Sequence, residues 1–458
     1  MTLQHLLGEI VGARNVLTAP EDTKPYFTDW RRQYSANAEC VVRPASTSEV
    51  SAVIALCARE EIAIVPQGGN TGLVGGSVPT GERREIVLSL ARMNRIRAID
   101  VLNDTATVEA GCVLAAVQRA ADDAGRLFPL SLAAEGSCQI GGNLSTNAGG
   151  VNVLRYGTAR EQVLGLEVVL PDGRVWNGLR ALRKDNTGYD LKQLFLGAEG
   201  TLGVITAAVL RLFPKPTATA TAWIALDSPR AAVELLGLLR SRVGDRLSAF
   251  ELISRVCLEA VLQHSRDVHD PLGAVHPWYV LAEFGDSGSS ELLRERVESA
   301  LEECAGRGAL RDAAIAQSNE QTRGLWRIRE TIPEAQFTNV KHDVSVPVSR
   351  IPEFIERIDR ELGRIFPEVK IYCFGHVGDG NLHYNVGPES LMTRREEVSR
   401  IVYDALDPFD GSISAEHGLG QLKREEIRRH KDPLELELMR ALKRTLDPKS
   451  LMNPGKVL

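Results

Sequence analysis

The spacing of apolar residues in the first half of the chain predicts mainly short strands, with a few helices between them. Ser46 and Glu49 form a capping-box pattern ahead of the apolar stripe Val50, Val53, Ile54 and Cys57, which predicts a helix. A second helix is expected at 114–124. Strands are expected at 40–44, 62–65, 86–90, 96–100, 106–109 and 201–213, and a hairpin at 164–170 and 175–176 around the Asp172-Gly173 turn.

The pattern changes after Pro214-Lys215-Pro216, a proline pair that marks the expected domain boundary. Beyond it, strand-like runs at 222–226, 279–284 and 370–374 alternate with amphipathic helices at 231–243, 290–305 and 353–366. The sequence therefore predicts a first domain at 1–216, an α/β domain at 217–410 and a C-terminal segment at 411–458.

Three glycine-rich runs interrupt the first domain, at 67–76, 136–150 and 197–205. Glycine allows backbone N–H groups to approach an anion closely, and consecutive N–H groups can form an anion-binding concavity. The first run lacks the helix of a dinucleotide fingerprint and the Gly-Lys-Ser/Thr of a phosphate-binding P-loop. One such run would favour a flexible surface loop, but three in one domain indicate a large polar cofactor threaded through it.

Composition excludes several classes of protein. The 458 residues are 43% hydrophobic and 25% charged with a net charge of −6, which is typical of a soluble globular chain and argues against a nucleic-acid partner. The seven cysteines are scattered without a C-x-x-C pair, so a disulfide framework is not expected and a reducing, cytoplasmic setting is. No secretory signal or transmembrane run is present.

The glycine-rich runs resemble the FAD-binding domain of the vanillyl-alcohol-oxidase or p-cresol-methylhydroxylase type. The resemblance implies an α+β protein with a two-part FAD-binding domain, an α/β substrate (cap) domain and a C-terminal segment that returns to the FAD domain. Some relatives attach FAD through His or Cys, whereas the first run here has Asn70 and the second only the thiol of Cys138. We therefore expect noncovalent FAD.

The resemblance carries a set of cofactor-binding residues onto this chain. They are Pro66, Gln67, Gly68, Gly69, Asn70, Thr71, Gly72, Leu73, Gly75, Gly76, Gly136, Ser137, Gly141, Gly142, Asn143, Ser145, Asn147, Ala148, Gly149, Gly150, Glu199, Gly200, Gly203, Ile205 and Asn453.

A cluster of histidines in the second half predicts a metal site. Strand-like runs at 370–374 and 382–386 flank the turn Gly378-Asp379-Gly380-Asn381. Pairing about this turn would place His376 opposite His383, with Asn385 on the same face. Ser414–Gly420 adds Glu416 and His417. Two His and one Glu with open positions are typical of catalytic Zn²⁺ or a similar divalent ion.

These motifs resemble the substrate site of flavin-dependent D-2-hydroxy-acid dehydrogenases, which include D-2-hydroxyglutarate and D-lactate dehydrogenases. The match extends over nearly the whole chain, to Asn453-Pro454-Gly455-Lys456. It implies that His376, His383 and Glu416 bind the metal, and that His417 is the general base. It also implies that Arg329, Lys341, Asn385 and His417 contact the substrate.

The resemblance leaves the exact substrate open, because Pro333 stands where hydroxyglutarate-type relatives tend to carry a hydroxyl residue. D-2-hydroxyglutarate is the first expectation, with D-lactate and glycolate as alternatives. A flavin-free metallohydrolase and a non-catalytic metal-binding protein are rival interpretations of the histidine cluster alone. The resemblance further implies an electron acceptor such as an electron-transfer flavoprotein or a quinone, and a homodimer, since relatives are often dimers.

Overall fold

The computed structural model describes residues 1–458, which form two compact units. Unit 1 consists of Met1–Gly149, Thr158–Lys215 and Glu416–Leu458, and unit 2 of Gly150–Gly157 and Pro216–Ala415. The chain therefore leaves the first unit twice. One departure follows the proline-flanked Lys215, and the other is the short excursion that begins at Gly150, which the sequence pattern does not separate.

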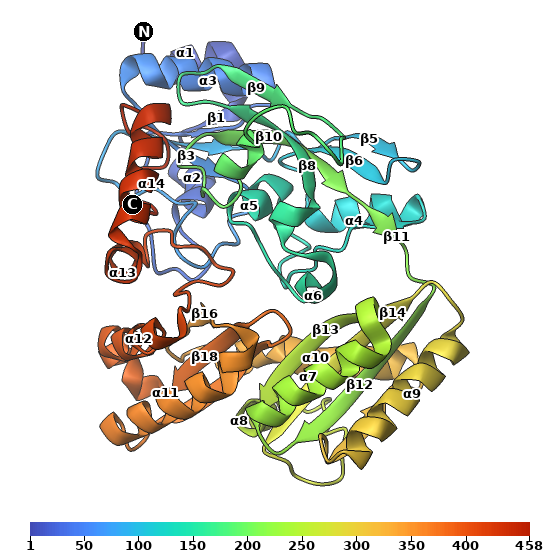
Figure 1. The fold of residues 1–458 in the computed structure, drawn as a ribbon. Helices are drawn as coiled ribbons and strands as arrows, with labels where there is room; N and C mark the ends of the chain where they lie inside the picture. The colour runs from blue at the N-terminus through green and yellow to red at the C-terminus, as the bar shows by residue number, and fades with distance from the viewer. The chain divides into compact units, whose positions relative to one another are not determined.

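Unit 1 contains three sheets (Figure 1). The first has the order β1-β2-β4-β3, and its strands are β1 (Val16–Leu17), β2 (Val41–Val42), β3 (Ala63–Gln67) and β4 (Glu85–Ser89). The second is antiparallel in the order β5-β6-β10-β8-β9, with β5 (Ile96–Asp100), β6 (Thr105–Glu109), β8 (Val163–Val169), β9 (Val175–Gly178) and β10 (Val204–Arg211). A small third sheet pairs β7 (Arg126–Leu127) with β11 (Phe213–Pro214).

Seven helices complete this unit: α1 (Leu3–Val11), α2 (Pro20–Phe27), α3 (Thr47–Glu60), α4 (Leu114–Asp123), α5 (Ile140–Ser145), α13 (Arg424–His430) and α14 (Pro433–Leu446). The predicted helix α3 is confirmed, and Ser46 Oγ accepts a hydrogen bond from Glu49 N at 3.2 Å. The Glu49 carboxylate accepts from Ala45 N instead of Ser46 N, so the capping box is only half formed. Helix α5 lies inside the second glycine-rich run, where no helix was predicted.

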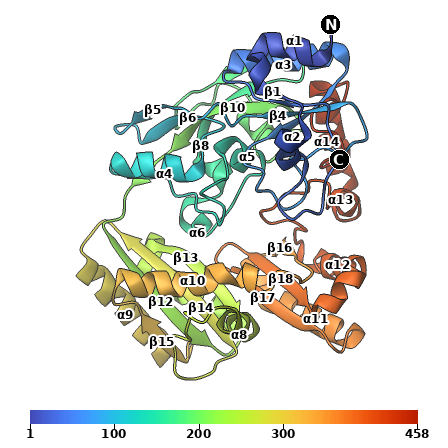
Figure 2. The same cartoon turned by 180° about the vertical axis from the view of Figure 1, so that it is seen from behind.

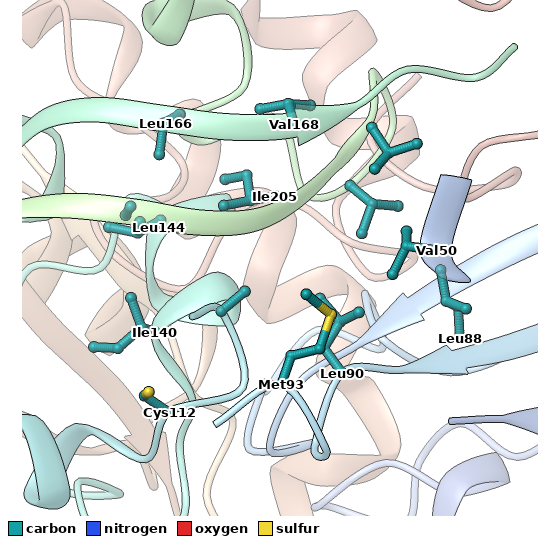
Figure 3. Close-up of a cluster of buried hydrophobic side chains, with 14 of the residues drawn as sticks. Val50, Leu88, Leu90, Met93, Cys112, Ile140, Leu144, Leu166, Val168 and Ile205 are labelled. Carbon is teal, nitrogen blue, oxygen red and sulfur yellow. The ribbon is translucent and has the colours of Figure 1, made fainter. Parts of the chain in front are cut away.

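One hydrophobic cluster joins the two larger sheets of unit 1 (Figure 3). Leu88 of β4 and Val50 of α3 contribute from the first sheet and its helix, and Leu166 and Ile205 contribute from the second sheet. The C-terminal segment also joins this core, because Met452 forms a parallel bridge with Ile64 of β3. The predicted return of this segment to the FAD-type domain is thereby confirmed.

Unit 2 is built on one seven-stranded antiparallel sheet in the order β15-β12-β14-β13-β17-β18-β16. The strands are β12 (Ala218–Leu226), β13 (Leu247–Ser254), β14 (Trp278–Asp286), β15 (Asp312–Ile315), β16 (Asp343–Ser345), β17 (Lys370–His376) and β18 (Asn381–Gly387). The helices are α6 (Val153–Tyr156), α7 (Pro229–Val243), α8 (Arg255–His264), α9 (Ser290–Gly306), α10 (Asn319–Ala335), α11 (Ile351–Ile365) and α12 (Arg395–Asp404).

The helices of unit 2 cover both faces of its sheet. Helices α7, α9 and α11 lie on the face seen in Figure 1, and α8 and α10 on the face seen in Figure 2. Ile253 and Phe374 project toward α8 and α10, where they pack in one cluster with Ile328. Because side chains alternate along a strand, residues two positions from these on β13 and β17 share the same face. None of the helices in either unit is long and apolar enough to cross a membrane.

The core of unit 1 generates a stability prediction. Leu166 is fully buried in the cluster, whereas Leu102 is fully exposed. Leu166→Ala should lower the free energy of unfolding by about 2–5 kcal/mol, because it removes buried methyl groups and leaves a cavity. Leu102→Ala is the matched control and should leave the thermal melting temperature unchanged. Equal melting temperatures for the two variants would contradict the assigned core.

Candidate active site

The first two glycine-rich runs of unit 1 pack directly against each other. A Cβ atom on Gly69 would lie 2.1 Å from the carbonyl oxygen of Ser137, closer than any real contact. A Cβ on Gly68 would lie 3.4 Å from the Cβ of Gln139. Gly69 is therefore required because two backbones meet there without space for a side chain, whereas a Cβ on Gly68 would make an ordinary contact.

The third run joins the other two. The backbone N–H of Glu199 donates to Ser145 O at 2.8 Å, which ties the third run to the second. A Cβ on Gly200 would lie 3.1 Å from Cγ of Pro66, beside the first run. All three predicted cofactor-binding runs thus converge within unit 1.

Strained backbone marks each of these runs and the C-terminal segment. Asn70, Asn147, Glu199 and Asn453 have φ values of 52°, 48°, 51° and 43°, in the left-handed region that residues other than glycine seldom adopt. Such conformations cost about 1–3 kcal/mol each and are concentrated at functional sites.

The amide side chains of these runs serve largely to brace the backbone. Asn70 Nδ2 donates to Pro25 O at 3.1 Å and Thr28 O at 2.8 Å. Asn453 Nδ2 donates to Gly76 O at 2.9 Å and Glu199 O at 2.7 Å. A cofactor in these loops would therefore be met mainly by backbone groups.

Two buried acceptors in the same region lack a protein partner. They are Gln139 Oε1 and Asn453 Oδ1. A Cβ on half-buried Gly142 would meet no atom within 4 Å, so open space lies beside the second run. Buried acceptors without a partner are rare in proteins, and these two fit a ligand that donates hydrogen bonds, as the ribityl chain, the flavin ring and the adenine of FAD can.

The single thiol within these loops is poorly suited to covalent attachment. Cys138 is buried, and its Sγ accepts a hydrogen bond from Asn143 Nδ2 at 3.5 Å. Burial raises the pKa of the Cys138 thiol, which disfavours the nucleophilic thiolate.

The Glu199 carboxylate organises the segment that carries Glu416 and His417. Its two oxygens accept hydrogen bonds from Leu419 N at 2.7 Å and Gly420 N at 2.9 Å. Burial raises the pKa of Glu199, although these amides and Lys423 oppose the shift. In addition to its predicted cofactor role, Glu199 therefore holds the 416–420 segment in place.

Within unit 1, Glu416 lies at the end of the second glycine-rich run. A Cβ on Gly149 would lie 2.7 Å from Glu416 Oε1. The predicted metal ligand Glu416 and the half-buried His417 therefore belong to the unit that contains the cofactor loops.

In unit 2, the predicted histidine hairpin forms, but its register differs from the expectation. His383 pairs with Phe374, so the prediction that His376 lies opposite His383 is wrong. The end of β17 leaves β18 and pairs instead with β13, where His376 lies opposite Glu251. The error is two residues, and since side chains alternate with a period of two, both histidines still share a face. Their ring centroids are 5.8 Å apart.

A buried carboxylate joins this histidine to an arginine. Glu251 is completely buried, with Oε1 at 2.5 Å from His376 Nδ1 and Oε2 accepting from Arg329 Nε at 2.7 Å. Burial opposes ionisation of Glu251, but His376 and Arg329 outweigh it and lower the pKa of this carboxyl to about 2. Sequence reasoning missed Glu251, although a lone acid in the apolar run Leu247–Ser254 was an available signal.

The other two predicted substrate residues of unit 2 use their polar groups on the protein. Lys341 Nζ donates to Pro333 O at 2.9 Å. Asn385 is buried, with Oδ1 accepting from His342 N at 3.0 Å and Nδ2 donating to Gln336 Oε1 at 3.0 Å. The Asn385 side chain therefore braces the site in this structure.

The chain leaves unit 2 beside the histidines. Asp343 lies opposite His383 across β16 and β18. The backbone N–H of Ala415 donates to Asp343 O at 3.4 Å, and Glu416 is the next residue. The segment that carries Glu416 and His417 thus follows directly after Ala415, which is hydrogen-bonded to Asp343, the cross-strand neighbour of His383.

Comparison with known proteins agrees with both halves of this arrangement. Residues 38–178 match the model of the FAD binding domain, and residues 215–457 match that of the C-terminal domain of FAD linked oxidases. The chain belongs to the FAD-linked oxidase family. It is therefore an FAD-dependent oxidoreductase, and the rival interpretation as a flavin-free hydrolase is wrong.

Two named relatives are similar to this chain over most of its length. D-2-hydroxyglutarate dehydrogenase of Xanthomonas citri pv. viticola is 39% identical, over 98% of this chain and 96% of that protein. The mitochondrial D-2-hydroxyglutarate dehydrogenase of Bos taurus is 41% identical, over 97% of this chain and 81% of that protein. The solved structure of p-cresol methylhydroxylase is similar in fold, with a TM-score of 0.77 and 16% identity. The match covers 99% of this chain and 96% of that protein. The predicted α+β fold of the p-cresol-methylhydroxylase type is thereby confirmed.

The close contact between the first two runs predicts that a side chain at Gly69 reduces FAD binding. Gly69→Ala should push the runs apart, because its Cβ would meet the backbone oxygen of Ser137. We expect the purified variant to have lost most of its FAD, measured as the flavin-to-protein ratio. Gly237→Ala in α7 is the control, since its Cβ would meet no atom, and it should keep full FAD. Stoichiometric FAD in Gly69→Ala would contradict this assignment.

Proposed function

We propose that this chain oxidises D-2-hydroxyglutarate to 2-oxoglutarate, holds FAD without a covalent bond and passes the electrons to a separate acceptor. The observation that carries the proposal is the Arg329–Glu251–His376 cluster beside His383, in a chain of the FAD-linked oxidase family. Named relatives at about 40% identity support the choice of substrate.

Arg329 is the proposed partner of a substrate carboxylate. Its Nε donates to Glu251, and Nε is the only nitrogen of Arg329 that donates to a protein atom. The two terminal nitrogens are left for a carboxylate, which a guanidinium binds in a bidentate manner. Lys341 is the proposed second cation. Two cations suit a dicarboxylate better than D-lactate or glycolate, which carry one carboxylate each.

His376, His383 and Glu416 are the proposed ligands of a divalent metal, with Zn²⁺ the first choice. Glu251 engages Nδ1 of His376, and in a ring oriented by a carboxylate in this way the other nitrogen, Nε2, would be the metal ligand. Two imidazoles and one carboxylate with open positions are a usual catalytic zinc set. A metal held there would polarise the C2 hydroxyl of the substrate and lower its pKa.

His417 is the proposed general base. It follows the metal ligand Glu416 directly and takes the proton of the C2 hydroxyl, a task that suits an imidazole near neutral pH. The chemistry that bound FAD would supply is that of an acceptor for the hydride on C2. Loss of that proton and hydride converts the hydroxy acid into the 2-oxo acid.

An electron-transfer flavoprotein or a quinone is the proposed acceptor, and a homodimer the proposed assembly. All seven cysteines are free thiols, which supports a reducing compartment, and we propose the cytoplasm.

Anaerobic flavin reduction tests the substrate. D-2-hydroxyglutarate should bleach the flavin absorbance of the purified yellow protein much faster than D-lactate or glycolate at equal concentration, because only it can engage both cations. D-lactate is the alternative that the missing hydroxyl at Pro333 keeps open. Faster bleaching by D-lactate would replace the proposed substrate.

Substitution of the base tests the mechanism. His417→Ala should slow flavin reduction by D-2-hydroxyglutarate about 10²–10⁴-fold, the usual contribution of general base catalysis, while FAD stays bound. His264→Ala, at an exposed position in α8, is the control and should reduce flavin at the wild-type rate. A wild-type reduction rate in His417→Ala would refute the role of His417.

A further inference from the structure

The fully buried Glu251 stands alone among uncharged neighbours on its strand. All eight residues of β13 are buried, and Glu251 is the one charged residue among them. An ionised carboxylate without partners in such a place would be strongly destabilising. Its ion pairs with Arg329 and His376 therefore explain why an acid is present at this position.

The contact with His376 fixes the hydrogen of that imidazole. An ionised carboxylate can only accept hydrogen bonds, so the hydrogen lies on Nδ1, which is 2.5 Å from Glu251 Oε1. The lone pair of the neutral ring is then on Nε2. Because β13 and β17 pair with Glu251 opposite His376, the sheet itself sets the direction of the ring.

The contact with Arg329 fixes the direction of the guanidinium. Nε donates to Glu251 Oε2, and the guanidinium carbon lies 4.8 Å from the centroid of the Phe374 ring. These two contacts hold the planar group, and neither of them uses a hydrogen of the terminal nitrogens.

We propose that Glu251 is a positioning residue that sets the metal-binding nitrogen of His376 and, through its other oxygen, the carboxylate-binding nitrogens of Arg329. This inference rests on the proposed function, because it assumes that His376 binds a metal and Arg329 the substrate. One carboxylate then places the ion and the substrate carboxylate relative to each other.

Glu251→Gln is the decisive variant because glutamine is nearly isosteric. Its Oε1 can still accept from Arg329 Nε, but its NH₂ must donate to His376 Nδ1. That reverses the imidazole tautomer and places a hydrogen on Nε2, which prevents metal binding by the neutral ring. Glu251→Asp is shorter but keeps an acceptor for Nδ1–H. A role in filling space predicts that Gln is the milder change, whereas tautomer control predicts that Asp is.

The experiment is zinc titration of FAD-bound, chelator-treated protein, followed by calorimetry, with FAD content and melting temperature measured in parallel. We expect Glu251→Gln to weaken zinc binding about 10–100-fold, the usual effect of losing such an outer partner, and Glu251→Asp to weaken it less. Glu283→Gln is the matched control. It is a half-buried carboxylate on the neighbouring strand β14 that accepts a hydrogen bond from Trp326 Nε1 at 2.7 Å, and its change should leave zinc binding unchanged.

The outcomes separate this inference from the proposed function. Wild-type zinc affinity in Glu251→Gln, or a larger loss in Glu251→Asp, overturns the inference alone. Wild-type protein that binds no divalent metal overturns the proposed metal site and the inference with it.

A double-substitution comparison tests the link to Arg329 through catalysis. At saturating zinc, Glu251→Gln and Arg329→Lys should each raise the KM for D-2-hydroxyglutarate. The combined variant should lose less than the product of the two single losses, since both changes break the same ion pair. Multiplicative losses would overturn the coupling.

Discussion

The position of the 416–420 segment depends on one buried residue, Glu199. This residue ties together four parts of unit 1 that are far apart in sequence: its N–H binds Ser145 O, its C=O binds the Asn453 side chain, and its oxygens bind Leu419 N and Gly420 N. Left without those amides, the buried carboxyl would be strongly destabilising. His417 precedes Leu419 by two residues, so its placement is inseparable from the fold of the cofactor loops.

The course of the chain provides the second constraint. The glycine-rich run that ends at Gly149 continues without a break into α6 of unit 2, where Leu154 packs against Gly378 in the histidine hairpin turn. The segment that leaves unit 2 at Ala415 starts beside Asp343 and enters unit 1 as Glu416. Covalent continuity thus links the cofactor loops to the elements that carry the histidines at two points along the chain.

Some of this arrangement could be predicted from the sequence, and the rest depended on long-range pairing. The amphipathic helices α7, α9 and α11 were predicted because each has one apolar face, and β8 because it is a largely apolar run before the Asp172-Gly173 turn. Strand β13 was not predicted, because a strand buried on both faces shows no alternation. The hairpin register was wrong for a related reason: β17 ends against β13, a partner more than a hundred residues away, and local turn geometry carries no information about it.

The same limit applies to the role of each polar residue. The resemblance implies a substrate contact for Arg329, Lys341 and Asn385 alike. Their hydrogen bonds separate them, because Asn385 has both ends of its amide occupied by protein groups whereas Arg329 uses only Nε. A buried donor is available to a ligand only when the fold leaves it unused, and that can be decided only after every neighbouring backbone group has its partner. The terminal nitrogens of Arg329 meet this condition, and Glu251, which no motif marked, is the reason they do.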